Sequence, residues 1–330
     1  MPEIIVKDLM KYYRQKKAVT IDKGTIKNAE VKAVDGVSFE LEKGEILGVI
    51  GESGCGKSTL GRVLVGLEKP TSGEILISGT DSQALLKKDR KSFHRMVQIV
   101  FQNPFDTFDP RHTIRKILVD ACKMHNIGTN EAERTEIVLN IMREAGLQPP
   151  EDYLDRYSFE LSGGQLQRIS ILRSMLLDPS FLVADEPVSM LDVSVRADII
   201  NMLLKLVREK NATMVFISHD IATTRYISDR VAVMYLGRIV EMGKTDDILH
   251  HPMHPYTRAL ISNNASLDPN EKRERIPIPG EPPTPIGTGP GCYFAPRCPF
   301  AKEHCFKSYP EYQTGKDGRI VSCFEVDAQK

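Results

Sequence analysis

The chain has 330 residues, and its 44 basic and 44 acidic side chains give a formal charge of zero. This length exceeds one typical hydrophobic core and fits a domain of about 250 residues with a small extra module. The sequence has no basic field for nucleic acid, no signal-peptide pattern at its start, and no apolar run of the roughly 20 residues that cross a bilayer. We therefore expect a soluble cytoplasmic subunit that reaches a membrane only through partners.

The first 80 residues read mainly as strands. Residues 3–45 and 68–80 fit an antiparallel sheet, and the stretch 22–32 reads as a hairpin extension without an assigned role. Between these regions, Ile46–Ile50 is a short, continuous apolar run. Such a run is typical of a parallel strand that is buried on both faces.

A glycine-rich motif, Gly51-Glu-Ser-Gly-Cys-Gly-Lys57-Ser58, follows this strand and fits the phosphate-loop pattern. Its glycines let consecutive backbone N–H groups converge on phosphate oxygens. The apolar spacing over 60–67 predicts a helix next, whose N-terminus favours anions. Lys57 is expected to reach the β- and γ-phosphates, and the Ser58 hydroxyl to bind Mg²⁺. The residues assigned to ATP binding in this loop are Gly51, Ser53, Gly54, Cys55, Gly56, Lys57, Ser58 and Thr59.

Further apolar runs read as core strands, and polar residues follow them. These runs are 97–101, 181–184 and 213–217. After the second run, Asp185 is placed to hold the Mg²⁺ shell, and Glu186 could polarise an attacking water. His219 follows the third run, at the carboxyl edge where ligands bind in open α/β sheets. Residues 111–160 read as mainly helical with a break at 146–150, and 197–207 as an apolar helix.

The order of these motifs resembles an ATP-binding-cassette nucleotide-binding domain over about residues 1–255. The motifs are the phosphate loop, Gln102, Leu161-Ser-Gly-Gly-Gln165, Asp185-Glu186, Ser189-Met-Leu-Asp192 and His219. The resemblance implies an α/β P-loop NTPase fold with a RecA-like core, an antiparallel β subdomain and a helical subdomain at about 103–165.

The resemblance also implies roles in ATP hydrolysis. Glu186 is the base for the attacking water, Gln102 touches Mg²⁺ and the water, and His219 contacts the γ-phosphate. Tyr13 corresponds to the aromatic residue that stacks on adenine, with Tyr12 as the alternative.

A second ATPase subunit is implied as a partner, because in this family the Leu-Ser-Gly-Gly-Gln signature serves the ATP of the opposing subunit. The signature residues are Ser162, Gly163, Gly164 and Gln165. Asp192 would lie on the loop that crosses the dimer interface, and residues 103–110 would face a membrane subunit. Met190 stands where Ala is more usual and Leu166 where Arg is frequent, but neither change removes a catalytic group.

Four cysteines occur late in the chain, after a Pro- and Gly-rich stretch over 276–291. Cys292, Cys298, Cys305 and Cys323 have the spacing C-x5-C-x6-C-x17-C. Disulfides are disfavoured in a cytosolic compartment, so the thiolates could hold a structural zinc or an iron–sulfur cluster, with unligated thiols as the third possibility. The lack of close C-x2–4-C pairs favours the cluster.

Three segments resemble the C-terminal module of oligopeptide/dipeptide importer ATPases, which we assign to 256–330. They are Gly280-Glu-Pro-Pro283, Gly291-Cys-Tyr-Phe and Arg297-Cys-Pro299. Members of that family can carry a four-cysteine [4Fe–4S] cluster in this module. Residues 33–39 and Cys55 resemble the F-type of the two ATPase subunits. The proline among His250, His251 and His254 favours a surface turn over a metal site.

The resulting hypothesis is an ATP-hydrolysing motor subunit of a di-/oligopeptide importer at the cytoplasmic face of a prokaryotic membrane. Its implied partners are a second, different ATPase chain, two transmembrane permeases and, indirectly, an external solute-binding protein, with no nucleic acid. One alternative keeps the motor but changes the cargo to oligosaccharides or another solute. Another is a soluble cassette ATPase acting on DNA or ribosomes, which the single cassette and the absence of a basic field disfavour.

Overall fold

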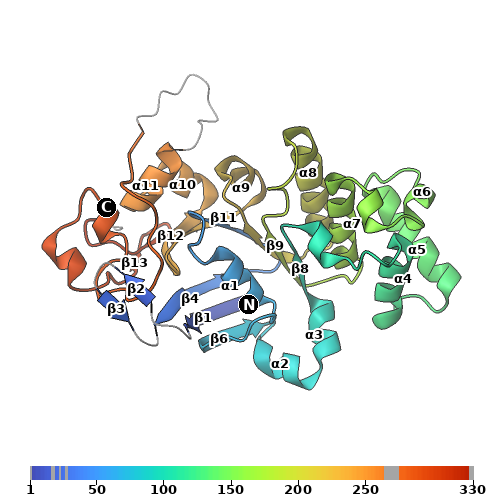
Figure 1. Cartoon of the computed structure of the whole chain (residues 1–330), viewed down its shortest axis with the longest axis horizontal. Coiled ribbons are helices and arrows are strands. Elements are labelled where there is room, and N and C mark those ends of the chain that lie inside the picture. The colour runs from blue at the N-terminus through green and yellow to red at the C-terminus, as the bar shows by residue number, and fades with distance from the viewer. Residues whose placement is uncertain (1, 16–18, 22–23, 27–28, 264–274, 327–330) are drawn as a thin grey trace. The chain divides into compact units, whose positions relative to one another are not determined.

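The computed structural model describes residues 2–15, 19–21, 24–26, 29–263 and 275–326, which form two compact units (Figure 1). Unit 1 combines Met1–Leu41, Glu45–Asp81 and Val215–Lys330. Unit 2 combines Glu42–Gly44 and Ser82–Met214. Nowhere within these described ranges is a helix long and apolar enough to cross a membrane.

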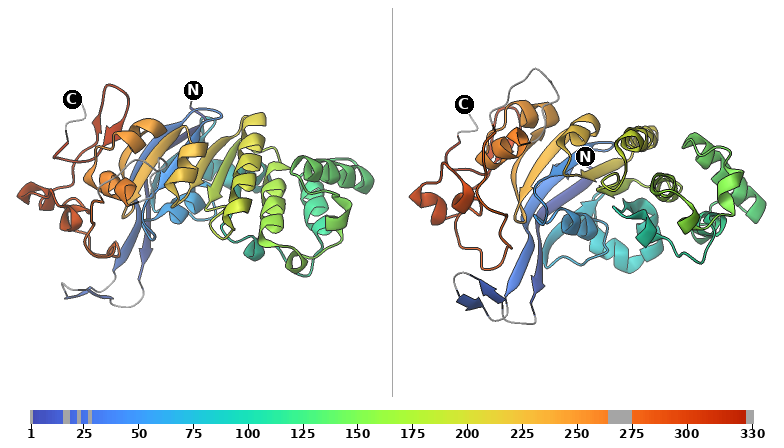
Figure 2. Two further views of the ribbon diagram at one scale, coloured as in Figure 1. Left: turned by 90° about the horizontal axis from the view of Figure 1, so that it is seen from above. Right: turned by 45° about the horizontal axis from the view of Figure 1, so that its top comes forward.

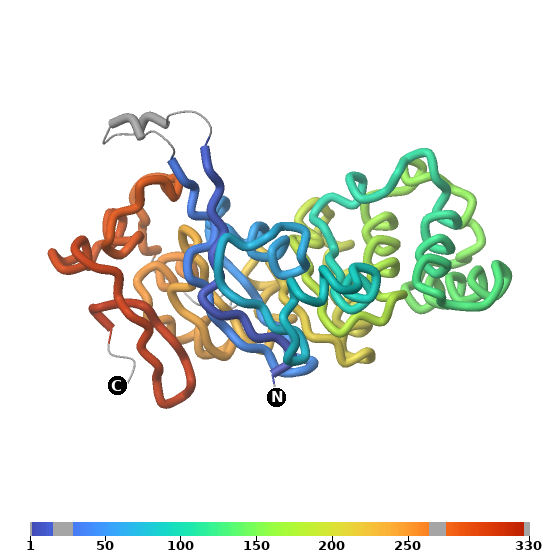
Figure 3. The backbone as a smooth tube through the Cα atoms, turned by 90° about the horizontal axis from the view of Figure 1, so that it is seen from below, coloured from blue at the N-terminus to red at the C-terminus, as the bar shows by residue number. Residues whose placement is uncertain are grey.

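An antiparallel sheet in unit 1 confirms the strands predicted over 3–45 and 68–80. Its order is β4 (Glu30–Leu41), β1 (Ile4–Arg14), β6 (Ser72–Ile77) and β7 (Thr80–Asp81). Figure 3 shows β1 and β4 side by side. The short strands β2 (Val19–Ile21) and β3 (Gly24–Ile26) pair antiparallel; β3 falls within the stretch 22–32 predicted as a hairpin extension, whereas β2 precedes it. Residues 22–23 and 27–28 of that stretch lie outside the described residues.

The second sheet region of unit 1 begins with β5 (Ile46–Ile50), which is buried along its whole length as its apolar run predicts. It pairs parallel with β11 (Arg230–Tyr235), and β11 pairs antiparallel with β12 (Arg238–Lys244). Two short strands extend this region, β14 (Ile320–Val321) on β12 and then β13 (Gln313–Thr314).

The helices of unit 1 cover these strands. They are α1 (Lys57–Leu64), α9 (Ile221–Ile227), α10 (Thr245–His250) and α11 (Pro255–Ser262), with single turns η3 (Ala295–Arg297) and η4 (Glu303–Phe306). Figure 2 shows the C-terminal segment, in red, beside the orange helices α10 and α11. Tyr235, Tyr256 and Phe294 are each at most 1% exposed and pack together, so this segment shares a hydrophobic core with β11 and α11.

Unit 2 contains the parallel pair β8 (Val97–Val100) and β9 (Phe181–Asp185), which confirms two of the predicted core strands. The third, β10 (Thr213–Ile217), lies at the boundary, with residues 213–214 in unit 2 and 215–217 in unit 1. The helices of unit 2 are α2 (Ser82–Lys88), α3 (Arg90–Met96), α4 (Ile114–Met124), α5 (Glu131–Glu144), α6 (Glu151–Leu154), α7 (Gly163–Met175) and α8 (Val193–Glu209), with single turns η1 (Pro104–Thr107) and η2 (Ser158–Glu160).

The predicted helical region 111–160 and its break are both present in unit 2. Helix α5 ends at Glu144, and Gly146 adopts φ 73° before α6 begins. Helix α8 is longer than the predicted 197–207, because the extended backbone of Asp192 (φ −63°, ψ 150°) lets the helix start at Val193. The apolar pattern begins only after the first turn, so it underestimates this helix.

Candidate functional site

The glycine-rich loop joins β5 to α1 in unit 1, as predicted, and two of its glycines have no room for a side chain. A Cβ on Gly51 (φ 154°) would lie 2.2 Å from Met234 O, and one on Gly56 (φ 105°) would lie 1.9 Å from Ala33 O. The loop backbone therefore packs directly on neighbouring strands. Ser53, next to Gly54, is exposed at the tip of the loop, where a ligand could reach it.

Lys57 is 5% exposed, and its ammonium is turned back onto the loop. Its Nζ donates to Gly51 O at 2.8 Å and to Glu52 O at 3.0 Å. The buried Cys55 fills the space beneath, and burial raises the pKa of its thiol. A triphosphate would offer this buried cation stronger, anionic acceptors than two carbonyls.

Two other predicted residues of unit 1 lie on β1 and after β10. The Tyr13 hydroxyl donates to the Glu68 carboxylate, and Lys11 Nζ lies 4.9 Å from the Tyr13 ring centroid. His219 is exposed, and the preceding Ser218 N–H donates to Val49 O at 3.2 Å. The chain therefore leaves β10 close to the point where β5 enters the glycine-rich loop.

Gln102 and Glu186 of unit 2 are brought into direct contact. Gln102 Nε2 donates to Glu186 Oε2 at 2.9 Å and to Ser189 Oγ at 3.1 Å. Ser189 in turn donates through Oγ to Glu186 O at 3.1 Å. Glu186 has φ 46°, an uncommon left-handed conformation for a side chain of this size, and Asp185 before it is 5% exposed.

Ser189 is a member of this cluster for which the sequence analysis predicted no role, although it begins the motif Ser189-Met-Leu-Asp192. Its hydroxyl holds both the amide of Gln102 and the backbone of Glu186. The available signal was its position three residues after Glu186, a spacing at which a serine hydroxyl can reach back to a preceding carbonyl.

The signature residues form the N-terminus of α7. Ser162 Oγ accepts from Gln165 N at 3.3 Å, and Gln165 Oε1 accepts from Ser162 N at 3.0 Å, a reciprocal capping box. Gly164 packs on α8, where a Cβ would lie 2.7 Å from Val195 Cγ1. Ser162 is exposed at the mouth of the helix, and Asp192 is exposed before α8.

The predicted nucleotide residues thus fall into two groups, one in each unit. Unit 1 carries the glycine-rich loop, Tyr13 and His219, and unit 2 carries Gln102, Asp185, Glu186, the signature and Asp192.

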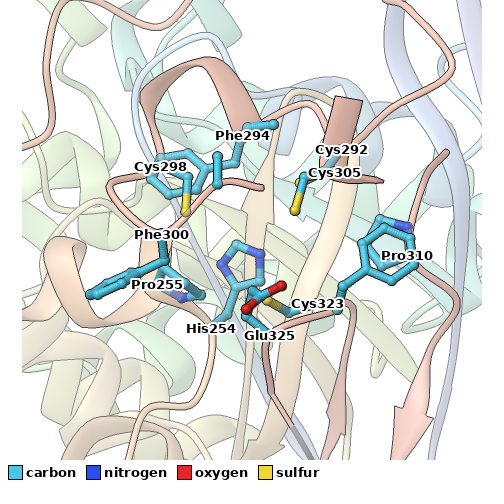
Figure 4. A pocket seen from close by; sticks show the side chains of 13 residues that line it. His254, Pro255, Cys292, Phe294, Cys298, Phe300, Cys305, Pro310, Cys323 and Glu325 are labelled. Carbon is cyan, nitrogen blue, oxygen red and sulfur yellow. The ribbon is translucent and has the colours of Figure 1, made fainter. Parts of the chain in front are cut away.

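The four late cysteines line one pocket of unit 1, with a cavity of about 20 Å³ (Figure 4). Phe294, Phe300 and Pro310 form part of its apolar wall. Burial raises the pKa values of the Cys292 and Cys298 thiols above their ordinary value. It raises the pKa of the Cys323 thiol to about 11. Four soft sulfur donors in one enclosed place are a ligand set that suits either zinc or an iron–sulfur cluster.

Within the described ranges, one trio of possible metal-ligand atoms lies within 4.8 Å of one another, namely those of His304, Cys305 and Glu325. Of the four late cysteines, this trio contains Cys305 alone.

The surface turn expected at His250, His251 and His254 is wrong for the last of these. His250 and His251 are exposed, but His254 is 1% exposed and borders the cysteine pocket. Its Nδ1 accepts from Tyr256 N at 3.0 Å, and the backbone N–H of His254 donates to the buried carboxylate of Glu241 at 2.9 Å. Burial lowers the pKa of His254 to about 3. The Glu241 carboxylate accepts hydrogen bonds from the backbone of this turn and so holds it in the interior. The sequence around the turn gives no sign of this acceptor.

Comparison with known proteins places two family matches on the chain. The family described as "ABC transporter" matches residues 34–189, and "Oligopeptide/dipeptide transporter, C-terminal region" matches residues 240–305. The dipeptide transport ATP-binding protein DppF of Haemophilus influenzae is 46% identical over 319 residues, covering 97% of this chain and 95% of that protein. The oligopeptide transport ATP-binding protein AppF of Bacillus subtilis is 47% identical over 300 residues, covering 90% of each.

A solved structure shares the fold. The ATP-binding cassette MJ0796, in a dimeric post-hydrolysis state bound to ADP and Pi, gives a TM-score of 0.63 with 26% sequence identity. The match covers 73% of this chain and 98% of that chain. The α/β cassette fold predicted from the motif order is therefore confirmed.

Proposed function

The chain belongs to the ABC transporter family of ATP-binding cassettes, and on this premise we propose that it is the ATP-hydrolysing motor subunit of a di-/oligopeptide importer. The observation that carries the proposal is the co-occurrence of an ATPase cassette with the oligopeptide/dipeptide C-terminal region in one chain. The two relatives named above are peptide transport ATP-binding proteins, and this chain matches them over nearly their whole length.

In this proposal the glycine-rich loop binds the phosphates of ATP. Lys57 exchanges its two loop carbonyls for the β- and γ-phosphate oxygens, and the loop N–H groups supply further donors. Tyr13 stacks on the adenine ring, and His219 contacts the γ-phosphate. The Ser58 hydroxyl and the Asp185 carboxylate offer the hard oxygen ligands that Mg²⁺ prefers, and the ion would neutralise charge on the phosphates.

Glu186 is proposed as the general base. Its carboxylate accepts a proton from the water that attacks the γ-phosphorus, and the bond from that phosphorus to the β–γ bridging oxygen breaks. Gln102 holds the carboxylate through its amide and orients the water beside it. The left-handed backbone of Glu186 is a strained conformation of the kind found where a catalytic side chain must point in one direction.

A second ATPase chain is proposed to complete each ATP site. Ser162, Gly163, Gly164 and Gln165 would bind the γ-phosphate of ATP held by that chain, because the exposed N-terminus of α7 presents N–H groups to an anion. Asp192 would lie at the same interface. Residues 103–110, where Phe105 is 47% exposed, are proposed to contact one of two permeases, with an external solute-binding protein delivering the peptide.

Residues 256–330 are proposed as a C-terminal module that follows a cassette spanning 1–255. Its four cysteines are proposed to hold a [4Fe–4S] cluster, with zinc as the alternative. Their place around one pocket supports a shared metal site, and the lack of close C-x2–4-C pairs in the sequence favours the cluster.

The test of the importer proposal is uptake of labelled peptides by cells that lack this chain. We expect loss of di- or oligopeptide uptake, restored by the wild-type chain and not by Glu186→Gln. Loss of oligosaccharide uptake alone would instead support the alternative cargo. Unchanged uptake of both, with ATP hydrolysis stimulated by DNA or ribosomes, would overturn the importer proposal.

A further inference from the structure

Glu52, the second residue of the glycine-rich loop, is held by residues from the far end of the chain. Its N–H donates to the Tyr256 hydroxyl at 2.8 Å. Its carboxylate accepts two parallel hydrogen bonds from Arg297, Nη1 to Oε2 at 2.7 Å and Nη2 to Oε1 at 3.1 Å. Both the backbone and the side chain of Glu52 are thus fixed within unit 1, and the two-point contact is the strong form of an arginine–carboxylate pair.

Arg297 is itself held in one orientation. Its Nε donates to Pro279 O at 3.0 Å, Nη2 donates to Gly280 O at 2.9 Å, and Nη1 also reaches the Tyr235 hydroxyl at 3.3 Å. The side chain of Arg297 is 7% exposed and that of Glu52 is 23% exposed. Removing one member of so buried a pair leaves the other charge uncompensated, so the two residues depend on each other.

The same stretch of loop also carries the lysine. Lys57 Nζ donates to the carbonyl oxygens of Gly51 and Glu52. The segment of loop backbone that Arg297 holds through the Glu52 side chain therefore also accepts the hydrogen bonds of the lysine. Glu52 belongs to the loop that is proposed to bind the triphosphate, so its carboxylate adds a negative charge to that loop. Without a compensating cation, its charge would repel the phosphates, and the repulsion would be strong in a partly buried setting.

We propose that Arg297 is a positioning residue for ATP binding. It fixes the start of the glycine-rich loop through Glu52 and neutralises a carboxylate that would otherwise oppose the triphosphate. This inference rests on the proposed role of the loop as the phosphate site. The C-terminal module proposed over 256–330 would thereby take part in nucleotide binding through Arg297 and Glu52.

The test is equilibrium binding of a fluorescent ATP analogue to the full-length chain at several salt concentrations. We expect Arg297→Gln to weaken binding about tenfold or more at low salt, because an unpaired charge acts at short range. The loss should shrink as salt screens the repulsion. In the double variant Glu52→Gln/Arg297→Gln no charge is left unpaired, so affinity should recover most of the way to wild type.

Arg319→Gln is the matched control, because Arg319 belongs to the same segment but pairs with Asp317 and His251 O. Thermal unfolding of each variant identifies any that misfold. If Arg297→Gln fails to fold, Arg297→Lys replaces it; lysine keeps the charge but loses the two-point contact, so affinity should still fall, by an amount that does not vary with salt. Binding by the single variant that equals wild type would overturn the inference, as would a double variant that binds as weakly as the single. Wild-type affinity in Lys57→Ala would instead overturn the phosphate-loop assignment itself.

Discussion

Gln102 and Glu186 follow two adjacent parallel strands, β8 and β9, and the amide of Gln102 donates to the Glu186 carboxylate at 2.9 Å. Parallel pairing sets the carboxyl ends of both strands at one edge of the sheet, so residues 84 positions apart meet there. The base proposed for hydrolysis is therefore held by a side chain that follows the neighbouring strand.

Replacing Glu186 by Gln removes the proton acceptor but keeps the size of the side chain. We expect ATP hydrolysis to fall by about 10²- to 10⁴-fold while ATP affinity stays within about twofold, since general base catalysis acts only on the chemical step. Phosphate release from the assembled transporter and binding of labelled ATP measure the two quantities. Retained turnover would mean that another group accepts the proton.

Gln102→Ala leaves the Glu186 carboxylate without its amide donor. We expect kcat to fall about tenfold with little change in KM for ATP, because the lost hydrogen bond orients the base and not the nucleotide. Steady-state kinetics on the assembled transporter distinguish this from a binding defect. A rise in KM at constant kcat would contradict the positioning role of Gln102.

Asp35 on β4 is a buried carboxylate at which several distant groups converge. It accepts from Tyr12 and from Tyr293 (2.7 Å), and it pairs with Arg238 at 3.0 Å. We expect Asp35→Asn to destabilise the protein by about 3 kcal/mol, because the Arg238 charge is left unpaired. Urea unfolding measures the change. Asp317→Asn, at a more exposed pair, is the control and should shift stability by less than about 1 kcal/mol.

The pH dependence of this contribution has a definite sign. Burial acts to raise the pKa of Asp35, but the hydrogen bonds from Tyr12 and Tyr293 and the charges of Arg238 and Lys32 outweigh it, so the pKa lies below its ordinary 3.8. A carboxyl with a lowered folded-state pKa stabilises above that ordinary value and loses its effect as the pH falls below it. The stability difference between wild type and Asp35→Asn should therefore shrink below about pH 4, and a constant difference would contradict this assignment.

Metal analysis tests the cysteine pocket. After anoxic purification we expect about four iron atoms per chain with matching sulfide and a broad visible band, which Cys298→Ser should abolish. Cys122→Ala is the matched control, because Cys122 is buried in α4 of unit 2 and does not line the pocket. Zinc instead of iron, or no metal, would refute the cluster and leave the ATPase proposal standing.

Local patterns in the sequence predicted the strands, the loop geometry and the helical region well. Apolar runs identify β5, β9 and β10 because strands buried on both faces need apolar side chains at every position. The glycine-rich pattern likewise predicted a tight loop. The structure shows why glycine is needed there, since a side chain on Gly51 or Gly56 would clash with backbone atoms of Met234 or Ala33.

Contacts between remote segments were not predictable in this way. Arg297 and Glu52 are 245 residues apart, and Tyr293 and Asp35 are 258 apart. Single-sequence patterns carry periodicity and spacing but no information on which charges pair after folding. For the same reason the burial of His254 against Glu241 could not be inferred from its proline-flanked turn.

Tyr256, Tyr293 and Arg297, all after residue 255, form hydrogen bonds with Glu52 or Asp35 near the start of the chain. These contacts limit where the chain can be truncated or recombined. A fragment that stops at residue 255 would lack all three of these hydrogen-bond partners, so it is not a faithful substitute for the whole chain in nucleotide studies. A chimera that joins the first 255 residues to the tail of a relative must match these pairs across the junction. The two parts are therefore expected to change together, as one inherited block.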